Sequence, residues 1–290
     1  MTVFSDVVLN QDPIKVEPLG GGKSGAKLAY YKHNVKAVIK EEKELAPNGH
    51  PTQRGLLITT LPYREVAFYK LAKLLDWTDI VPEVVLLDYK GKNASAQSYV
   101  PALNLHEITP NLEESDNNPN WIKDLVETCK LVSRESFRRL TILDIIAGSR
   151  DRHSKNIGFK YKIAGDRISY YLVGWDNACT FGRYFTYYHN VFHKRLFREK
   201  INLEPYYEKL ENIRLDDFVG TFEGLIAIEE IYHAFLRLQF IIDFSYKIPW
   251  LEISKGEDNL NKFPEYREYF IREDLPDEKE PLLSQQTFLY

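Results

Sequence analysis

The chain has 290 residues, of which 44% are hydrophobic and 28% are charged, as in soluble globular proteins that bury a core. Its length suits one large domain or two lobes that share a cleft. The formal net charge of -4 argues against a general nucleic-acid binder, because such proteins usually carry a basic excess, and no nucleic-acid partner is expected.

The two cysteines, Cys129 and Cys179, give neither a disulfide framework nor the spacing of a zinc site. We therefore expect a reducing compartment, with the cytoplasm as the location. No basic segment leads into an apolar one at the N-terminus, so no secretory signal is predicted. No apolar run approaches the ~20 residues that a membrane-spanning helix needs, so no transmembrane segment is predicted either.

Residues 13–40 are predicted to form strands joined by a glycine-rich turn, because apolar residues alternate on both sides of that turn. The turn reads Gly20, Gly21, Gly22, Lys23, Ser24 and Gly25. Glycines let a backbone approach a ligand closely and leave N–H groups free to face phosphate oxygens. A plain flexible hairpin loop is the alternative, since glycine-rich turns are common. No GxxxxGK[ST] run precedes a helix, so this is not a Walker A loop.

The strand after this turn ends in Lys40. Alternation places Lys36, Val38 and Lys40 on one face, with Val35, Ala37 and Ile39 on the other. Lys40 could reach a phosphate in a cleft, and Lys36 on the same face is its rival. A solvated strand edge is the alternative for both lysines.

Residues 61–77 show the apolar spacing of a helix, with Pro62 in its first turn, after a polar loop over residues 41–60. Glu65 is expected in that first turn, where it would complement the helix dipole or else pair with a cleft lysine. Two more strands are predicted in VPEVVLLDY and ASAQSYVPAL, around the turn KGKN.

From about residue 121 the residue pattern changes from mainly strand-like to mainly helical. Helical patterns cover residues 121–148, 206–213, 214–222 and 224–248, and ISYYLVGWDN reads as a strand that ends in an acid. We predict an α+β fold with two lobes. Residues 1–104 form a small antiparallel β-sheet N-lobe with one helix, and residues 105–290 form a larger, mostly helical C-lobe.

The charged stretch SRDRHSKNIGF lies between two apolar segments that are expected to be buried in the core. Phosphoryl transfer from a nucleotide needs a backbone cradle and a lysine for the phosphates, an acid that positions the acceptor hydroxyl, and oxygen ligands for magnesium. Asp151 would be the acid, and Asn156 and Asp176 would be the magnesium ligands. The spacing of Asp151 and Asn156 suits a loop in which both side chains face one cleft.

DRHSKN, followed later by WDN, resembles the phosphatidylinositol 3-/4-kinase superfamily, in which a D-R-H-x-x-N catalytic loop precedes an acid-led metal motif. HipA-like bacterial kinases are relatives with a similar loop. The other pieces occur in the same order over residues 15–185: GGGKSGAKLAYY as nucleotide loop, KAVIK as lysine strand, REVAFYKLAKLL as glutamate helix, IVPEVVLLDY as the next strand and SAQSYVP as the link between lobes.

The resemblance implies a two-lobed, protein-kinase-like fold and a kinase that uses ATP and magnesium. The implied nucleotide-binding residues are Gly21, Gly22, Lys23, Ser24, Gly25, Lys40, Glu65, Gln97, Tyr99 and Val100. The implied catalytic residues are Asp151, Arg152 and His153, and the implied magnesium ligands are Asn156 and Asp176. A structural ion pair with Asp151 is the alternative for Arg152, and a neutral core histidine is the alternative for His153.

The chain departs in two ways from the kinases that it resembles, and both concern which molecule accepts the phosphate. Ordinary protein kinases carry HRD and DFG, whereas this chain has DRH and DNA, the latter closer to the Asp-Asn-Gly of type II phosphatidylinositol 4-kinases. The second half resembles no accessory domain of the large lipid kinases, so the resemblance implies the reaction better than the acceptor. The compact size favours a protein Ser/Thr acceptor, including the chain itself. A small phosphoinositide kinase is the alternative, and a non-catalytic nucleotide-binding pseudokinase is the second alternative.

Residues 183–200 mix aromatic and basic side chains where an activation segment would lie. They could meet an anionic lipid or an acidic protein substrate, or form an amphipathic helix with a solvated face. Ser24 lies in the predicted phosphate loop, and its phosphorylation would add about -1.5 to -2 charges there. HipA-like kinases inhibit themselves in this way, while a small residue tolerated in a turn is the alternative.

Overall fold

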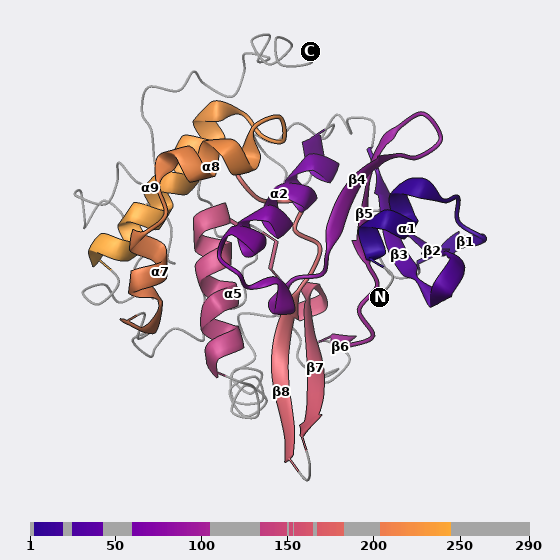
Figure 1. The fold of residues 1–290 in the computed structure, drawn as a ribbon, viewed down its shortest axis with the longest axis horizontal. Helices are drawn as coiled ribbons and strands as arrows, with labels where there is room; N and C mark the ends of the chain where they lie inside the picture. The colour runs from indigo at the N-terminus through magenta and orange to yellow at the C-terminus, as the bar shows by residue number, and fades with distance from the viewer. Residues whose placement is uncertain are drawn as a thin grey trace, which may run out of the picture.

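The computed structural model describes residues 3–19, 25–42, 60–104, 134–149, 151–152, 154–164, 167–182 and 204–244. A five-stranded antiparallel sheet forms the N-terminal part, and the C-terminal part is mainly helical, with a long β-hairpin between them (Figure 1). The predicted mixed α+β architecture is thereby confirmed.

The five-stranded sheet has the order β1-β2-β3-β5-β4, with all neighbouring strands antiparallel. Its strands are β1 (Lys15–Pro18), β2 (Lys27–Tyr30), β3 (Lys36–Glu41), β4 (Val84–Asp88) and β5 (Asn93–Ser98). The turn between β4 and β5 has positive φ at Lys90 (59°) and Gly91 (78°), as a two-residue hairpin turn requires. The strands predicted on both sides of the glycine turn and of KGKN are confirmed.

The two faces of this sheet differ. One face packs alanines and Ile39 against helix α1 (Phe4–Asn10), which contributes Val7 and Val8 to this small core. The other face carries Val38 and Lys40, as the alternation along β3 predicts. The sequence analysis did not predict α1, which has seven residues and no side-chain cap at its N-terminus, so its place depends on packing.

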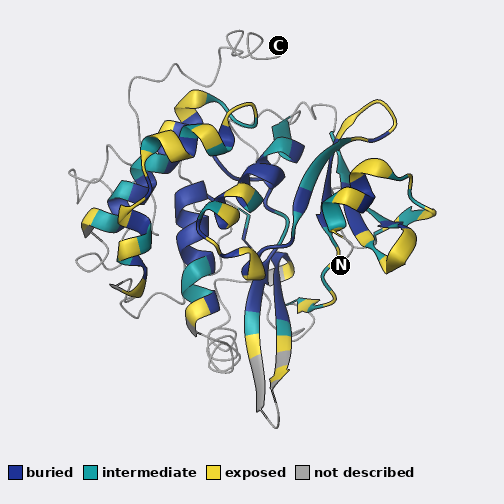
Figure 2. Cartoon of the chain, viewed as in Figure 1, coloured by how far each residue is buried: buried dark blue, intermediate teal, exposed yellow. Residues whose placement is uncertain are grey.

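Helix α2 (Leu61–Leu74) joins the sheet to the helical part. It packs against β4 and β5 on one side and against α5 (Arg134–Ala147) and α8 (Leu215–Phe222) on the other. Its apolar side chains belong to the main core, which Figure 2 shows as the dark blue interior. The helix and the place of Pro62 in its first turn are confirmed. Glu65, however, lies beyond the first turn, which contains no acid, so the dipole explanation for it is wrong.

The helical part also contains α7 (Tyr207–Glu211) and α9 (Ile228–Phe244). A three-stranded sheet combines β6 (Leu103–Asn104), β7 (Ile157–Ala164) and β8 (Arg167–Gly174) in that order. Strand β7 is an addition to the prediction, and with β8 it forms a hairpin that extends away from the helices (Figure 1). Short 3-10 helices are Lys32–Asn34 (η1), Thr78–Ile80 (η4), Ser154–Asn156 (η5) and Glu204–Tyr206 (η6).

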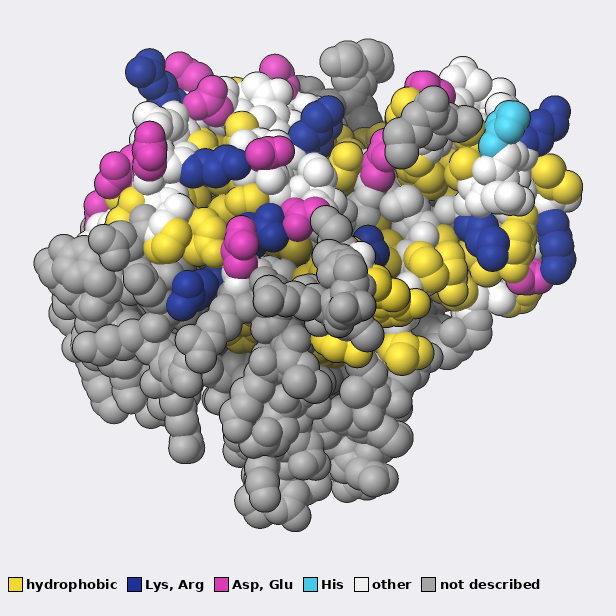
Figure 3. Space-filling model, turned by 60° about the horizontal axis from the view of Figure 1, so that its bottom comes forward, with side chains coloured by type: hydrophobic (Ala, Val, Ile, Leu, Met, Phe, Trp, Pro, Cys, Tyr) yellow, Lys and Arg dark blue, Asp and Glu magenta, His cyan; other side chains and the backbone are white. Residues whose placement is uncertain are grey.

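Several predictions fall on residues outside the described ranges, namely the helix over 121–133, the basic segment 183–200 and the chain beyond 244. None of the helices that the structure describes is long and apolar enough to cross a membrane. On the face shown in Figure 3, acidic and basic side chains of the described residues are intermixed over the helical part. This mixture accords with the small net charge of -4.

Candidate active site

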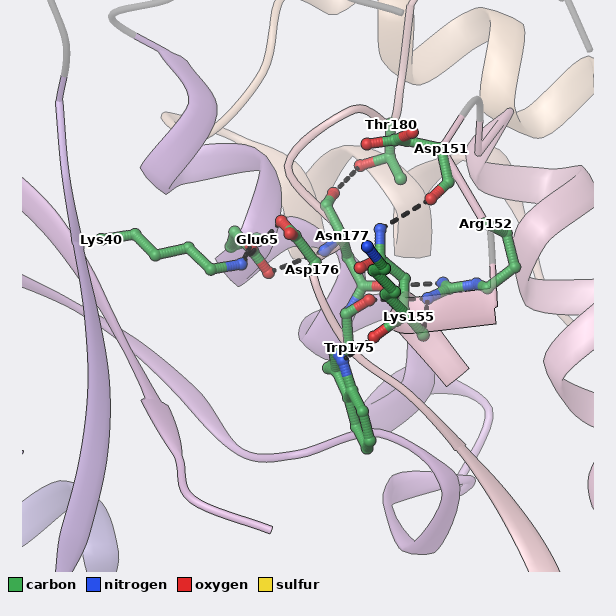
Figure 4. A network of polar contacts seen from close by, with 10 residues as sticks. Lys40, Glu65, Asp151, Arg152, Lys155, Trp175, Asp176, Asn177 and Thr180 are labelled. Atoms are coloured by element: carbon green, nitrogen blue, oxygen red, sulfur yellow. Dashed lines mark hydrogen bonds and ion pairs between the residues drawn. The ribbon is translucent and has the colours of Figure 1, made fainter. Parts of the chain in front are cut away.

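Three segments that are far apart in the sequence meet at Lys40. The lysine comes from β3, Glu65 from α2, and Asp176 from the turn after β8 (Figure 4). The Lys40 Nζ forms an ion pair with Glu65 and lies 2.8 Å from Asp176 Oδ1. The side chain of Glu65 is only 1% exposed and that of Lys40 14%, so the pair is held largely away from solvent. Lys40, and not its rival Lys36, therefore lies in the network.

Glu65 also connects α2 to the backbone beside Asp176. Its second carboxylate oxygen accepts a hydrogen bond of 3.0 Å from the backbone N–H of Asn177. Asp176 has a φ of 55°, in the left-handed region that aspartate adopts more readily than most residues. This backbone conformation lets the Asp176 carboxylate face Lys40 while the next N–H faces Glu65.

The charges around Lys40 determine its protonation state. Burial would lower the pKa of Lys40, but the negative charges of Asp176 and Glu65 and their hydrogen bonds outweigh it, and the pKa lies above its ordinary value. The ammonium group is therefore cationic at every physiological pH. A permanent, partly shielded cation at this place is suited to hold phosphate oxygens.

Arg152 organises the backbone behind the site. Its guanidinium is 1% exposed and pairs with Asp144 of α5, which is completely buried, at 2.8 Å. Its remaining N–H groups donate to the backbone carbonyls of Asn156 (3.0 Å) and Trp175 (2.7 Å) and to Asn177 Oδ1 (2.5 Å). Its Nε–H also donates to Asp144 Oδ2 (3.1 Å), so all five N–H donors of the guanidinium are used within the protein. The carboxylate that pairs with Arg152 is that of Asp144. The sequence analysis had offered the neighbouring Asp151 as the alternative partner.

This geometry corrects the catalytic role expected for Arg152. A side chain that is buried and fully hydrogen-bonded has no donor left for a substrate, so Arg152 is a positioning residue. It ties the loop that carries Asp151 and Asn156 to the turn that carries Asp176.

The loop and the turn also contact each other directly. The backbone N–H of Trp175 donates to the carbonyl of Asn156 (3.2 Å), and the indole Nε1 donates to the carbonyl of Lys155 (2.8 Å). The indole lies over Gly158, where an added Cβ would be 1.9 Å from the ring, so only glycine fits there. These contacts bring the predicted ligands Asn156 and Asp176 to neighbouring parts of the backbone.

The available oxygen atoms fit a magnesium ion shared with phosphates. The Asn156 amide nitrogen donates to the Asp151 carbonyl (2.8 Å), which leaves the amide oxygen as the end that would face a cation. Asp176 would add a carboxylate whose side chain is 36% exposed. Magnesium prefers such oxygen ligands, few in number and completed by phosphate and water. Within the described ranges, no group of three or more His, Cys, Asp and Glu side chains could form an all-protein metal cage.

A second buried network holds α2 from its other side. Arg64, next to Glu65, donates to Glu230 of α9 (2.7 Å), to the carbonyl of Thr180 (2.7 Å) and to Thr60 Oγ1 (2.9 Å). Both Arg64 and Glu230 are 3% exposed. The sequence analysis assigned no role to this pair, nor to Asp144 and Asn177. An acid inside the apolar run LTILDIIAG was the one available signal for Asp144, because a buried carboxylate needs a partner.

The remaining predicted residues lie on or beside the sheet. Gln97 is buried in β5, and Tyr99 after it is 41% exposed, with the Lys36 ammonium 5.7 Å from its ring. The carbonyl of Val100 accepts from the N–H of Ala102 (2.9 Å). Gly25 has a φ of 64°, which favours glycine. The predicted site residues outside the described ranges are Gly21, Gly22, Lys23, Ser24 and His153.

Comparisons with known proteins show which solved structures have a similar fold. No family model matches the sequence, and no curated protein matches it. The solved structure of hydra Fam20 with sugar is 13% identical and covers 86% of this chain and 89% of its own, with a TM-score of 0.57. The Golgi casein kinase is 13% identical, with 86% and 74% covered and a TM-score of 0.52. The same enzyme with Mn/ADP bound gives 13% identity, 87% and 76% coverage and a TM-score of 0.52. The chain thus has a kinase-like fold.

Proposed function

We propose that this chain is a phosphotransferase that moves the γ-phosphate of ATP, bound with magnesium, to a hydroxyl group. The observation that carries the proposal is Lys40 held between Glu65 and Asp176, with Glu65 also bound to the N–H of Asn177. A nucleotide triphosphate needs this combination of a fixed cation and a neighbouring carboxylate for its metal ion. A solved structure of similar fold contains Mn and ADP, which is consistent with the proposal.

The proposal gives each residue a role. Lys40 and the glycine-rich turn hold the phosphates, and Gly21, Gly22, Lys23, Ser24 and Gly25 supply the turn's backbone and side chains. Gln97, Tyr99 and Val100 line the place of the base. Asn156 and Asp176 would hold magnesium, whose charge would offset the negative charge of the phosphates. Arg152 and Asp144 fix the relative positions of these groups.

Asp151 acts on the acceptor. Its carboxylate accepts the proton of the acceptor hydroxyl as the hydroxyl oxygen forms a bond to the γ-phosphorus. The bond between that phosphorus and the bridging oxygen breaks, and ADP keeps the electron pair. His153, two residues after this acid in the sequence, is proposed to contact the phosphate.

The order of Asp, Arg and His in the loop supports a place near the phosphatidylinositol 3-/4-kinase superfamily and the HipA-like kinases. We propose a protein Ser/Thr acceptor, including the chain itself, with Ser24 as one position for self-phosphorylation. Residues 1–104 act as the N-lobe and residues 105–290 as the C-lobe. The cytoplasm is the proposed location, on the basis of the cysteine usage.

Transfer of label from γ-labelled ATP tests the proposal. Purified protein with magnesium is incubated alone, with a generic protein acceptor, or with vesicles that contain anionic lipids. Asp176→Ala removes the proposed metal ligand, and Asp216→Ala removes an exposed acid of α8 as a matched control. We expect label on protein with the wild type and Asp216→Ala, and none with Asp176→Ala.

The other outcomes separate the alternatives. Label only in the lipid fraction would replace the protein acceptor by a phosphoinositide. No label in any reaction, despite measurable nucleotide binding, would overturn the phosphotransferase in favour of a non-catalytic nucleotide-binding protein.

A further inference from the structure

The buried face of β5 contains a polar atom that has no hydrogen-bond partner among the described residues. Gln97 is 6% exposed, and its Oε1 atom is buried without accepting a hydrogen bond from any part of the chain that the structure describes. Ser95, two residues earlier and on the same face, is 1% exposed, and its Oγ atom likewise lacks a partner. Buried polar atoms nearly always have a hydrogen-bond partner, so an unsatisfied acceptor at this place points to a ligand that donates.

The strand register shows where this acceptor lies. Gln97 is directly opposite Val38 of β3, and Val38 is directly opposite Leu28 of β2. Directly opposite residues of an antiparallel pair point to the same face, so these three side chains form one row across the sheet. Lys40 follows two residues after Val38, on the same face and about 7 Å along the strand. The opposite face is closed by α1.

Helix α2 covers only one end of this row. It packs against β4 and β5, where Val84 is opposite Gln97 and is buried. Val38 is also buried, whereas Leu28 is partly exposed. Gln97 therefore lies where the covered part of the face gives way to the open part. A flat ring lying on Leu28 and Val38 would present its edge to Gln97, on the same face as the cation of Lys40.

We propose that Gln97 selects the nucleobase: its Oε1 atom accepts a hydrogen bond from an exocyclic amine at the edge of the bound base. Adenine has an amine at position 6, whereas hypoxanthine and guanine have a carbonyl there. With the amide in this orientation its oxygen can only accept, so a carbonyl in the same place would face it without a hydrogen between them. This inference rests on the proposed binding of a nucleotide and adds the choice of base.

Binding of ADP and of IDP, its hypoxanthine counterpart, tests this choice directly. Titration calorimetry in the presence of magnesium compares the two nucleotides on the wild type, Gln97→Met and Ser98→Ala. Methionine keeps the length of the side chain and removes the acceptor. Ser98, the next residue of β5, has its side chain on the opposite face by alternation and serves as the matched control.

We expect the wild type and Ser98→Ala to bind ADP at least about tenfold more tightly than IDP, as the loss of one buried hydrogen bond would give. Gln97→Met should bind both nucleotides with similar affinity. A ligand-side test avoids any effect on folding: the diphosphate of purine riboside, which has only hydrogen at position 6, should bind the wild type at least about tenfold more weakly than ADP.

Equal affinity of the wild type for ADP and IDP would overturn the inference, as would a preference that Gln97→Met retains. Both results include nucleotide binding and so leave the proposed function intact. If neither nucleotide binds, the inference fails together with the proposed function.

Discussion

Replacing Arg152 by methionine should unfold the protein at a much lower temperature, even though this arginine belongs to the predicted catalytic loop. Its guanidinium pairs with Asp144, which is 0% exposed, at 2.8 Å. Methionine approximates the length of the arginine stem but removes every donor. Asp144 would then be a buried charge without its partner, and the acceptors on Asn156, Trp175 and Asn177 would each lose a donor.

Removal of one member of a buried ion pair costs about 3–5 kcal/mol of the free energy of unfolding. This is a large part of the roughly 5–15 kcal/mol that stabilises a typical protein. For a chain of this size, each kcal/mol corresponds to roughly 2–4 °C in Tm, so we expect Arg152→Met to lower the Tm by roughly 6–20 °C.

Thermal unfolding followed by circular dichroism measures this effect. The double variant Asp144→Leu with Arg152→Met removes the orphaned charge and places leucine among the apolar residues of α5. It should recover at least about half of the lost Tm, because an apolar replacement of a buried pair is often neutral. If Arg152→Met melts within about 3 °C of the wild type, or if the double variant melts no higher than Arg152→Met, the positioning role is refuted.

Three further changes test other parts of the structure. The pKa of Lys40 is raised above its ordinary value of 10.5. Its ion pairs therefore contribute fully to the free energy of unfolding below pH 10.5, and this contribution is lost only as pH rises through the higher pKa of the folded state. Lys40→Met should accordingly lower the free energy of unfolding in urea by the same amount at about pH 7 and about pH 9. Arg64→Met should cost about 3–5 kcal/mol of unfolding free energy and weaken nucleotide binding, since it releases α2 from Glu230. Gly158→Ala should displace the Trp175 ring, which tryptophan fluorescence and a lower Tm would show.

Each of these has its own control. A Lys40→Met effect that shrinks between the two pH values would mean that the lysine is already losing its charge there. Glu230→Gln keeps an acceptor for Arg64 and should cost less than Arg64→Met; an equal cost would argue against the ion pair. Gly220→Ala on α8 has nothing within 4 Å of the added Cβ and should stabilise the helix by up to about 1 kcal/mol, whereas a similar gain at Gly158 would contradict the close packing.

Local pattern was sufficient for much of the fold. Alternation identified the strands around the glycine-rich turn, and the turn KGKN identified the β4–β5 hairpin. Helix α2 followed from its apolar spacing. Helix α1 was missed because seven residues are too short for a periodic signal. Strand β7 was not predicted, although IGFKYKIA alternates in the way expected of a strand.

The site needed tertiary information that one sequence does not contain. Alternation leaves Lys36 and Lys40 on the same face, and only the positions of Glu65 and Asp176 distinguish them. Arg152 was expected to be catalytic because it belongs to the motif DRHSKN that carries the resemblance, whereas its buried partner Asp144 lies in the preceding helix. The pair of Arg64 with Glu230 joins residues 166 positions apart, beyond the reach of any local pattern.

The most direct test of the account is whether Asp176 makes nucleotide binding depend on magnesium. Calorimetry with a non-hydrolysable ATP analogue, with and without magnesium, compares the wild type, Asp176→Ala and the exposed-surface control Asp216→Ala. We predict that magnesium tightens binding by the wild type and the control by at least about tenfold, and that Asp176→Ala loses this enhancement. Binding that is the same with and without magnesium, or an enhancement that Asp176→Ala retains, would contradict the site proposed around Lys40, Glu65 and Asp176.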